Sequence, residues 1–155
     1  EQGIIQVHMQ KENLVETILN ALGQIQKKAE DKGIFFQVEL PEKIICEHDK
    51  NWMCEALYNV FDNAVKYSKS NSTINITMKQ TEMFYKIQIR DYGIGIRDGE
   101  ENKIFQRFYR GEQARGQEGC GIGLYLSREI VLLQKGMMKA KQMKPGLLIE
   151  VNLPV

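Results

Sequence analysis

The sequence lacks the features of several common classes of protein. Its 21 basic and 20 acidic residues leave a net charge of +1, which gives no electrostatic reason to bind nucleic acid or an anionic membrane. The three cysteines form no C-x-x-C pair and no histidine cluster accompanies them, so neither a disulfide framework nor a zinc site is expected, and a reducing compartment is favoured. Because we find no signal peptide and no apolar run of transmembrane length, we expect a cytoplasmic location.

The common phosphate-binding fingerprints are also missing. No G-x-x-x-x-G-K-[ST] sequence occurs, and no glycine is followed by lysine, which excludes a P-loop. The H-R-D and D-F-G sequences of protein kinases are absent. Gly93, Gly95 and Gly99 do not fit G-x-G-x-x-G, and no parallel βαβ pattern surrounds them, which excludes a Rossmann site.

Length and composition indicate one globular domain spanning residues 1–155. A chain of 155 residues can bury about 70% of its unfolded surface around a single core. Its 43% apolar and 26% charged residues are ordinary values for such a domain.

The hydrophobic pattern predicts an α+β sandwich in which helices cover one face of a mixed or antiparallel sheet. Gly33 is expected to follow the first helix as its C′ residue, and Asp49 to cap the central helix. Expected strands cover residues 4–9, 34–40, 44–45, 73–80, 83–90, 137–143 and 147–153, and expected helices cover 11–32, 55–68 and 124–133.

The central helix combines an apolar stripe with a polar edge. Glu55, Asn59, Asn63 and Tyr67 recur every fourth residue, so they stand one above the other beside the stripe. Asparagine is a mediocre helix former, and a cavity for a polar ligand would explain two of them, although a polar edge satisfied by its neighbours is the alternative. The residues of the apolar stripe are Trp52, Met53, Ala56, Leu57, Val60, Phe61, Ala64 and Val65.

A glycine-rich region carries two further signals. Asp91 follows an expected strand and precedes Gly93 and Gly95, which would let the backbone approach a ligand closely, although a tight turn capped by the aspartate is the alternative. The second signal is Gly119 to Gly123, which opens into a helix whose N-terminus could bind an anion. The polar, glycine-punctuated residues 97–118 between them predict a mobile lid, with Arg107, Arg110 and Arg115 as phosphate partners.

These motifs together resemble four boxes of a known family. The chain resembles the ATP-binding catalytic domain of bacterial sensor histidine kinases, within the GHKL superfamily, over nearly its whole length. The resemblance implies a Bergerat-type two-layer α/β sandwich with an ATP lid. The matching residues, in the order of the N, G1, F and G2 boxes, are Asn59-x-x-x-Asn63-x-x-Lys66-Tyr67-Ser68, Asp91-x-Gly93-x-Gly95-Ile96, Phe105-x-x-Phe108-Tyr109-Arg110 and Gly119-x-Gly121-Ile122-Gly123-Leu124.

The resemblance assigns chemical roles to four of these residues. Asp91 would accept a hydrogen bond from the adenine amine, and Gly95 would let the base approach. Asn63 would supply the side-chain oxygen that binds Mg²⁺. Asn59 stands where related ATPases place a water-activating glutamate, and an amide cannot take a proton. This substitution fits a domain that does not spend ATP on hydrolysis.

Further roles follow from the same resemblance. Lys66 would contact phosphate, Tyr67 would pack along the nucleotide, and Arg110 would reach its terminal phosphates beside Arg107. Glu55, one turn before Asn59, is a candidate base. Phe105 and Phe108 would anchor the lid. The other residues expected to bind the nucleotide are Gly93, Ile96, Gly119, Gly121, Ile122, Gly123 and Leu124.

The chain departs from the family at two places. Cys120 stands where the G2 box usually has threonine or serine, and the phospho-accepting H box is missing. Neither His8 nor His48 matches that box, so the dimerisation and phosphoacceptor domain is expected on another part of a longer, membrane-anchored sensor. The expected ligands are ATP or ADP and Mg²⁺. The expected partners are that domain and, indirectly, a response regulator, and the domain alone is expected to be monomeric.

Three alternative functions remain open from the sequence. A GHKL ATPase of the topoisomerase or mismatch-repair kind is disfavoured by Asn59. An anti-sigma-type serine kinase is closer, but the F-box residues favour the histidine kinase. A degenerate nucleotide-binding module that serves only for partner contact is disfavoured by the intact Asn63 and Asp91.

Overall fold

A computed structural model describes residues 4–106 and 123–155. Its elements are β1 (Gln10–Asn13), α1 (Leu14–Lys32), β2 (Phe35–Glu39), β3 (Ile45–His48), α2 (Lys50–Tyr67), β4 (Thr73–Gln80), β5 (Phe84–Asp91), the short 3₁₀ helix η1 (Lys103–Phe105), α3 (Gly123–Leu133), β6 (Met137–Gln142) and β7 (Leu147–Pro154). No helix within the described residues is long and apolar enough to cross a membrane.

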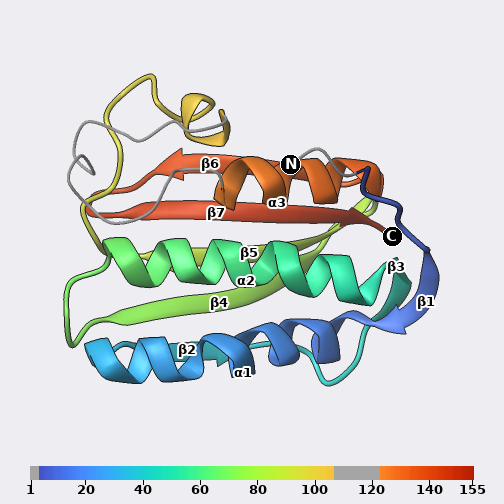
Figure 1. Cartoon of the computed structure of the whole chain (residues 1–155), viewed down its shortest axis with the longest axis horizontal. Helices are drawn as coiled ribbons and strands as arrows, with labels where there is room; N and C mark the ends of the chain where they lie inside the picture. The colour runs from blue at the N-terminus through green and yellow to red at the C-terminus, as the bar shows by residue number, and fades with distance from the viewer. Residues whose placement is uncertain (1–3, 107–122) are drawn as a thin grey trace.

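The main sheet has five strands in the order β2-β4-β5-β7-β6. β2 runs parallel to β4, and the remaining neighbours are antiparallel, so the sheet is mixed. The three long helices lie side by side on one face of it (Figure 1). Alternate residues of β4 and β5, such as Ile76 and Ile87, are buried on that face against the apolar stripe of α2. The predicted α+β sandwich is therefore confirmed.

A second, two-stranded sheet lies at one end of the molecule. β1 and β3 pair antiparallel there, with Gln10 opposite His48. The prediction of a strand over residues 4–9 is wrong, because those residues alternate in sequence but pair with no strand. The first helix begins at Leu14 rather than Lys11, because Asn13 caps it: its side chain accepts hydrogen bonds from Val15 N and Ile44 N.

Two predicted caps are present. Gly33 has φ of 74° and donates its N–H to carbonyls of the last turn of α1, as a C′ glycine does. The Asp49 carboxylate accepts from Asn51 N and Trp52 N and so caps α2, which begins five residues before the expected start at Glu55. Trp52 of the predicted stripe is half-buried and packs against the core, and its ring nitrogen donates to Gln6 O at 3.2 Å.

The elements meet at two opposite ends. The C-terminal end of α2, the end of β5 and the β6–β7 turn gather at one end, on the left of Figure 1, whereas α3 begins beside the middle of α2. The β1–β3 sheet and the first turns of α1 and α2 lie at the other end. The predicted site residues in the described part of the chain lie on α2, at the end of β5 and in the loop after it, and at the start of α3.

Candidate functional site

Asp91 is the buried acid of the candidate site. It is the last residue of β5, and its side chain is only 5% exposed. Its Oδ1 accepts hydrogen bonds from Gly93 N at 3.0 Å and from Leu147 N at 3.2 Å. Neither bond uses Oδ2, so one carboxylate oxygen is fixed by the backbone and the other can accept from a ligand.

Burial raises the pKa of the Asp91 carboxyl above its ordinary value of 3.8. The two backbone N–H donors and the positive charge of Arg90 oppose this shift without reversing it. A carboxylate held in a poorly solvated place is costly by itself and gains from a hydrogen-bond donor on a bound ligand.

Gly93 brings the loop after β5 onto the end of α2. A Cβ at Gly93 would overlap the carbonyl oxygen of Tyr67 and lie 2.7 Å from its carbonyl carbon. The neighbouring Ile94 N donates to that same Tyr67 O at 3.2 Å. Only glycine permits this approach, so Gly93 fixes the position of the loop relative to Tyr67.

The β6–β7 turn packs against the backbone of Asp91 and Gly95, a contact that the sequence did not predict. Gly146 has φ of 97°, and a Cβ there would lie 2.8 Å from the Asp91 carbonyl carbon. Gly95 has φ of 69°, and a Cβ there would lie 2.9 Å from Gly146 O. Pro145-Gly146 between two strands is a turn signal that could have marked this segment, but nothing local links it to Asp91.

The polar edge of α2 lies next to the start of α3 at Asn59. Asn59, Asn63 and Tyr67 are half-buried, whereas Glu55 is exposed. A Cβ on Gly123 would lie 3.8 Å from the Asn59 Cβ, so the first residue of α3 passes beside Asn59. Ser127 Oγ donates to Ala56 O at 2.8 Å and holds the two helices together.

Lys66 lies on the same helix but is engaged in an ion pair. Its Nζ lies 3.5 Å from Asp62, which also pairs with Lys28 at 3.3 Å. Lys32 Nζ donates to the carbonyls of Val65 and Lys66, each at 2.8 Å, and so satisfies acceptors in the last turn of α2. The proposed phosphate contact of Lys66 requires that its exposed Nζ leave Asp62, a surface exchange of small cost.

The remaining predicted residues divide into two groups. Ile96 and Leu124 are buried in the core, and Phe105 is buried under the guanidinium of Arg128, 5.4 Å from its ring centre. Residues 97–106 of the predicted lid are described and include η1. The predicted residues that lie outside the described residues are Arg107, Phe108, Arg110, Gly119, Gly121, Ile122 and lid residues 107–118.

The described residues offer only a sparse metal site. Residues 4–106 and 123–155 contain no group of three or more histidine, cysteine, aspartate or glutamate side chains that could hold a metal ion. Asn63 nevertheless fits Mg²⁺ that is bound mainly by phosphate and water, because Mg²⁺ keeps several waters and needs few protein ligands.

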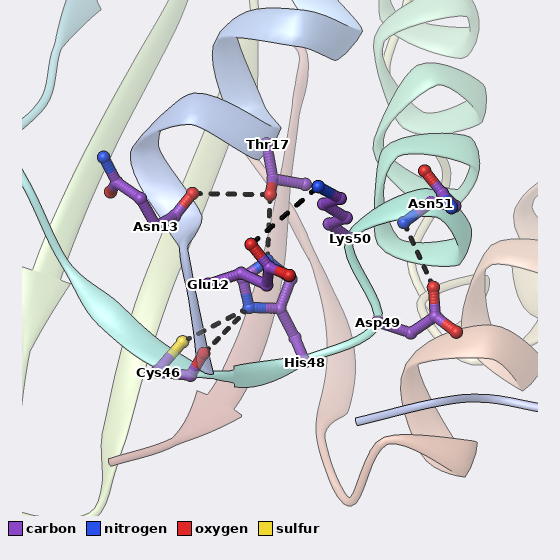
Figure 2. A network of polar contacts seen from close by, with 8 residues as sticks. All are labelled: Glu12, Asn13, Thr17, Cys46, His48, Asp49, Lys50 and Asn51. Carbon is purple, nitrogen blue, oxygen red and sulfur yellow. Dashed lines mark hydrogen bonds and ion pairs between the residues drawn. The ribbon is translucent and has the colours of Figure 1, made fainter. Parts of the chain in front are cut away.

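His48 belongs to a structural network at the opposite end (Figure 2). It is the last residue of β3 and is fully buried. Nδ1 lies 3.1 Å from Cys46 O, which can only accept, so Nδ1 carries the proton, and Nε2 lies 2.8 Å from Thr17 Oγ1. Burial lowers the pKa of His48 below 6.5. Since both ring nitrogens are engaged, this geometry agrees with the expectation that His48 is not a phosphoacceptor.

Comparison with known proteins agrees with the geometry. Residues 48–155 match the family described as histidine kinase-, DNA gyrase B- and HSP90-like ATPases. The chain is 34% identical over 143 residues to the sensor histidine kinase MtrB of Mycobacterium tuberculosis, covering 90% of this chain and 25% of that protein. It is 36% identical over 129 residues to the sensor protein kinase WalK of Staphylococcus aureus, covering 79% of this chain and 31% of that protein. The chain thus spans about a quarter to a third of these relatives.

Solved structures give the same result. The mycobacterial sensor histidine kinase MprB superposes with a TM-score of 0.84 at 25% identity, covering 95% of this chain and 97% of that one. The catalytic domain of histidine kinase ThkA shares the fold with a TM-score of 0.84 at 23% identity, covering 96% and 98%. The chain therefore belongs to the family of histidine kinase-, DNA gyrase B- and HSP90-like ATPases, as the ATP-binding catalytic domain of a two-component sensor histidine kinase.

Proposed function

We propose that this domain binds Mg²⁺·ATP and donates the γ-phosphoryl group to a histidine on a separate dimerisation domain. The observation that carries the proposal is the geometry of Asp91. Its buried carboxylate is held by two backbone amides and keeps Oδ2 for a ligand donor. The exocyclic amine of adenine is such a donor, and guanine presents an oxygen at the same position of the ring.

The polar edge of α2 supports phosphate binding beside the base. Asn63 would orient the phosphates through Mg²⁺, and Lys66 would neutralise their charge after leaving Asp62. The metal ion supplies charge stabilisation across the β- and γ-phosphates. Residues 119–122 precede α3 in the sequence, and Gly123 begins it beside Asn59. The N-terminus of a helix favours negative charge.

Transfer rather than hydrolysis is favoured by the side chain at position 59. An amide cannot accept a proton from water, and Glu55, one turn away, is exposed. Phosphoryl transfer requires little covalent work from the protein and depends on positioning and charge neutralisation. We therefore assign Asn59 and Asn63 to positioning and leave Glu55 as the candidate base.

The partners follow from the same proposal. The acceptor is the dimerisation and histidine-phosphotransfer domain of the same longer kinase, and a response regulator receives the group afterwards. One solved relative, ThkA, is a histidine kinase in complex with the response regulator protein TrrA. We place this domain on the cytoplasmic side of a membrane-anchored sensor, as a monomer when isolated.

The test is phosphoryl transfer in trans. The chain is mixed with the dimerisation domain of its own kinase and γ-labelled ATP, and label on that domain is measured with acid and base treatment, since phosphohistidine is lost in acid and survives base. Acid-labile label that requires Mg²⁺ and disappears with Asn63→Ala is expected. Free phosphate without label on the partner would instead support an ATPase.

A further inference from the structure

Arg90 binds two segments that meet next to Asp91, where the adenine base is proposed to bind: the end of β5 and the β6–β7 turn. It precedes Asp91 on β5, so its side chain leaves the opposite face of the strand. Its Nε donates to Asp91 O at 3.0 Å, and its Nη2 donates to Pro145 O at 2.8 Å. One guanidinium therefore joins the end of β5 to the β6–β7 turn, using the planar fork that lysine lacks.

A third contact fixes the guanidinium itself. Its central carbon lies 4.1 Å from the ring centre of Tyr92, the residue between Asp91 and Gly93. An arginine over an aromatic face gains from cation–π attraction. The side chain is thus held between the loop after β5 on one side and the turn on the other.

The turn that Arg90 holds is the one that orients Asp91. Met143 N donates to Gly146 O at 3.0 Å and closes the turn, and Leu147 N, directly after it, donates to Asp91 Oδ1. Gly146 packs against the Asp91 backbone, and Gly95 packs against Gly146 O. If the turn moved outward, Asp91 would lose the hydrogen bond from Leu147 N, and Gly146 would no longer pack against Asp91 and Gly95.

We propose that Arg90 is a positioning residue for base recognition, because it fastens the β6–β7 turn to the end of β5 and so fixes Asp91 and the backbone wall beside the base. The inference rests on the proposed binding of an adenine nucleotide. The side-chain hydrogen bonds of Arg90 reach main-chain oxygens of Asp91 and Pro145 and not the Asp91 carboxylate, so Arg90 acts on the base indirectly, through Asp91, Gly146 and Leu147.

Charge adds to the mechanical role. The positive charge of Arg90 lowers the pKa of Asp91 against the effect of burial. Without that charge, Asp91 stays protonated up to a higher pH. The fall of nucleotide affinity in acid, which we call the acid limb, should therefore begin at a higher pH. A residue that merely stabilised the fold would leave the position of that limb unchanged.

The test compares Arg90→Gln with Lys86→Gln. Lys86 lies four residues earlier on the same face of β5, so the control removes the same charge from the same strand away from Asp91. Affinities for ADP and for IDP, which carries an oxygen in place of the amine, are measured by calorimetry at several pH values. In Arg90→Gln we expect ADP to bind about tenfold more weakly, the equivalent of one weakened hydrogen bond, with IDP nearly unchanged.

Amide exchange supplies a readout without nucleotide. Exchange of the Leu147 amide should speed up in Arg90→Gln and stay unchanged in Lys86→Gln, because only the former frees the turn. Arg90→Lys retains the positive charge but not the planar guanidinium that donates to two carbonyls. The pH dependence of nucleotide affinity should therefore stay as in the wild type, while the Leu147 amide exchanges faster. This variant also serves if Arg90→Gln does not fold.

Three outcomes are separable. A reduced preference for ADP over IDP together with faster Leu147 exchange supports the inference. The inference is overturned if Arg90→Gln keeps the wild-type preference for ADP over IDP and the wild-type rate of Leu147 amide exchange. If only Arg90→Lys folds, the same result in that variant overturns it. In either case the proposed function stands. Wild-type protein that binds neither nucleotide overturns the proposed function and this inference with it.

Discussion

Oδ1 of Asp91 accepts a 3.2 Å hydrogen bond from the backbone N–H of Leu147, 56 residues further along the chain. The two residues also face each other in the β5–β7 pairing. The orientation of the buried acid is thus set by main-chain groups of the loop after β5 and of β7 rather than by neighbouring side chains. This arrangement leaves Oδ2 as the acceptor for a ligand and makes Asp91 separable from the stability of the fold.

Asp91→Asn should abolish base recognition without unfolding the domain. Asparagine keeps the acceptor that Gly93 and Leu147 use but presents an amide donor where the adenine amine needs an acceptor. We expect ADP affinity to fall about 10- to 100-fold, as for loss of a hydrogen bond to a charged group. Calorimetry measures the affinity and thermal denaturation the stability.

The stability of this variant has a predicted sign. The pKa of Asp91 is raised in the folded state, so ionisation of the buried carboxyl lowers stability as pH rises from 3.8 through the folded pKa, and the loss persists at neutral pH. Asparagine removes that loss, and the melting temperature at neutral pH should be equal to or above that of the wild type. A lower melting temperature with unchanged ADP affinity would contradict both statements.

Two glycines should differ sharply in their tolerance of a methyl group. Gly93→Ala would drive Cβ into Tyr67 O, so the loop must move off α2 and ADP binding should fall at least about tenfold. Among the described residues, a Cβ on Gly123 would meet only the Asn59 Cβ, at 3.8 Å, which is an ordinary contact, so Gly123→Ala should cost much less ADP affinity than Gly93→Ala. Equal affinities in the two variants would show that the docking of Gly93 on Tyr67 does not shape the site.

His48 should make the domain less stable in mildly acidic solution. Its pKa is lowered in the folded state, so the unfolded chain binds a proton first as pH falls below 6.5, and stability declines from there to the folded pKa. Urea denaturation between pH 7.5 and 5.5, roughly the range in which histidine titrates, measures this slope. His48→Gln should flatten this slope, and an unchanged slope in His48→Gln would show that His48 does not cause it.

Asp49 should matter for stability but not for nucleotide. Asp49→Ala removes the cap of α2 and should cost about 1–2 kcal/mol of unfolding free energy. Asp49→Asn keeps a capping acceptor and should cost less. Because the cap lies at the end of α2 opposite Tyr67, neither variant should change ADP affinity by more than about twofold, the scatter expected for distant sites. A large loss of affinity would show that this end is coupled to the site.

The sequence predicted what depends on local signals. Gly33 and Asp49 were recognisable as helix caps, and strands β4 and β5 followed from the alternation of their residues. The prediction of a strand at residues 4–9 was wrong, because alternating hydrophobicity does not provide a neighbouring strand to pair with. The polar residues Gln10–Asn13 form β1 because β3 lies beside them.

The parts of the site that escaped prediction are those assembled by distant segments. Gly146 and Leu147 contact Asp91 from a distant part of the chain, and no sequence signal marked Arg90. Burial of Asp91 itself could be anticipated from its place after a strand, but its hydrogen-bond donors could not. Contacts of high sequence separation leave no periodicity to detect.

The most direct test of the account is calorimetric titration of the chain with a non-hydrolysable ATP analogue, with and without Mg²⁺, for the wild type and Asn63→Ala. The wild type should bind more tightly with Mg²⁺, and Asn63→Ala should lose this Mg²⁺ dependence while keeping its affinity in the absence of metal. Absence of binding under either condition, or equal Mg²⁺ dependence in both proteins, would contradict it.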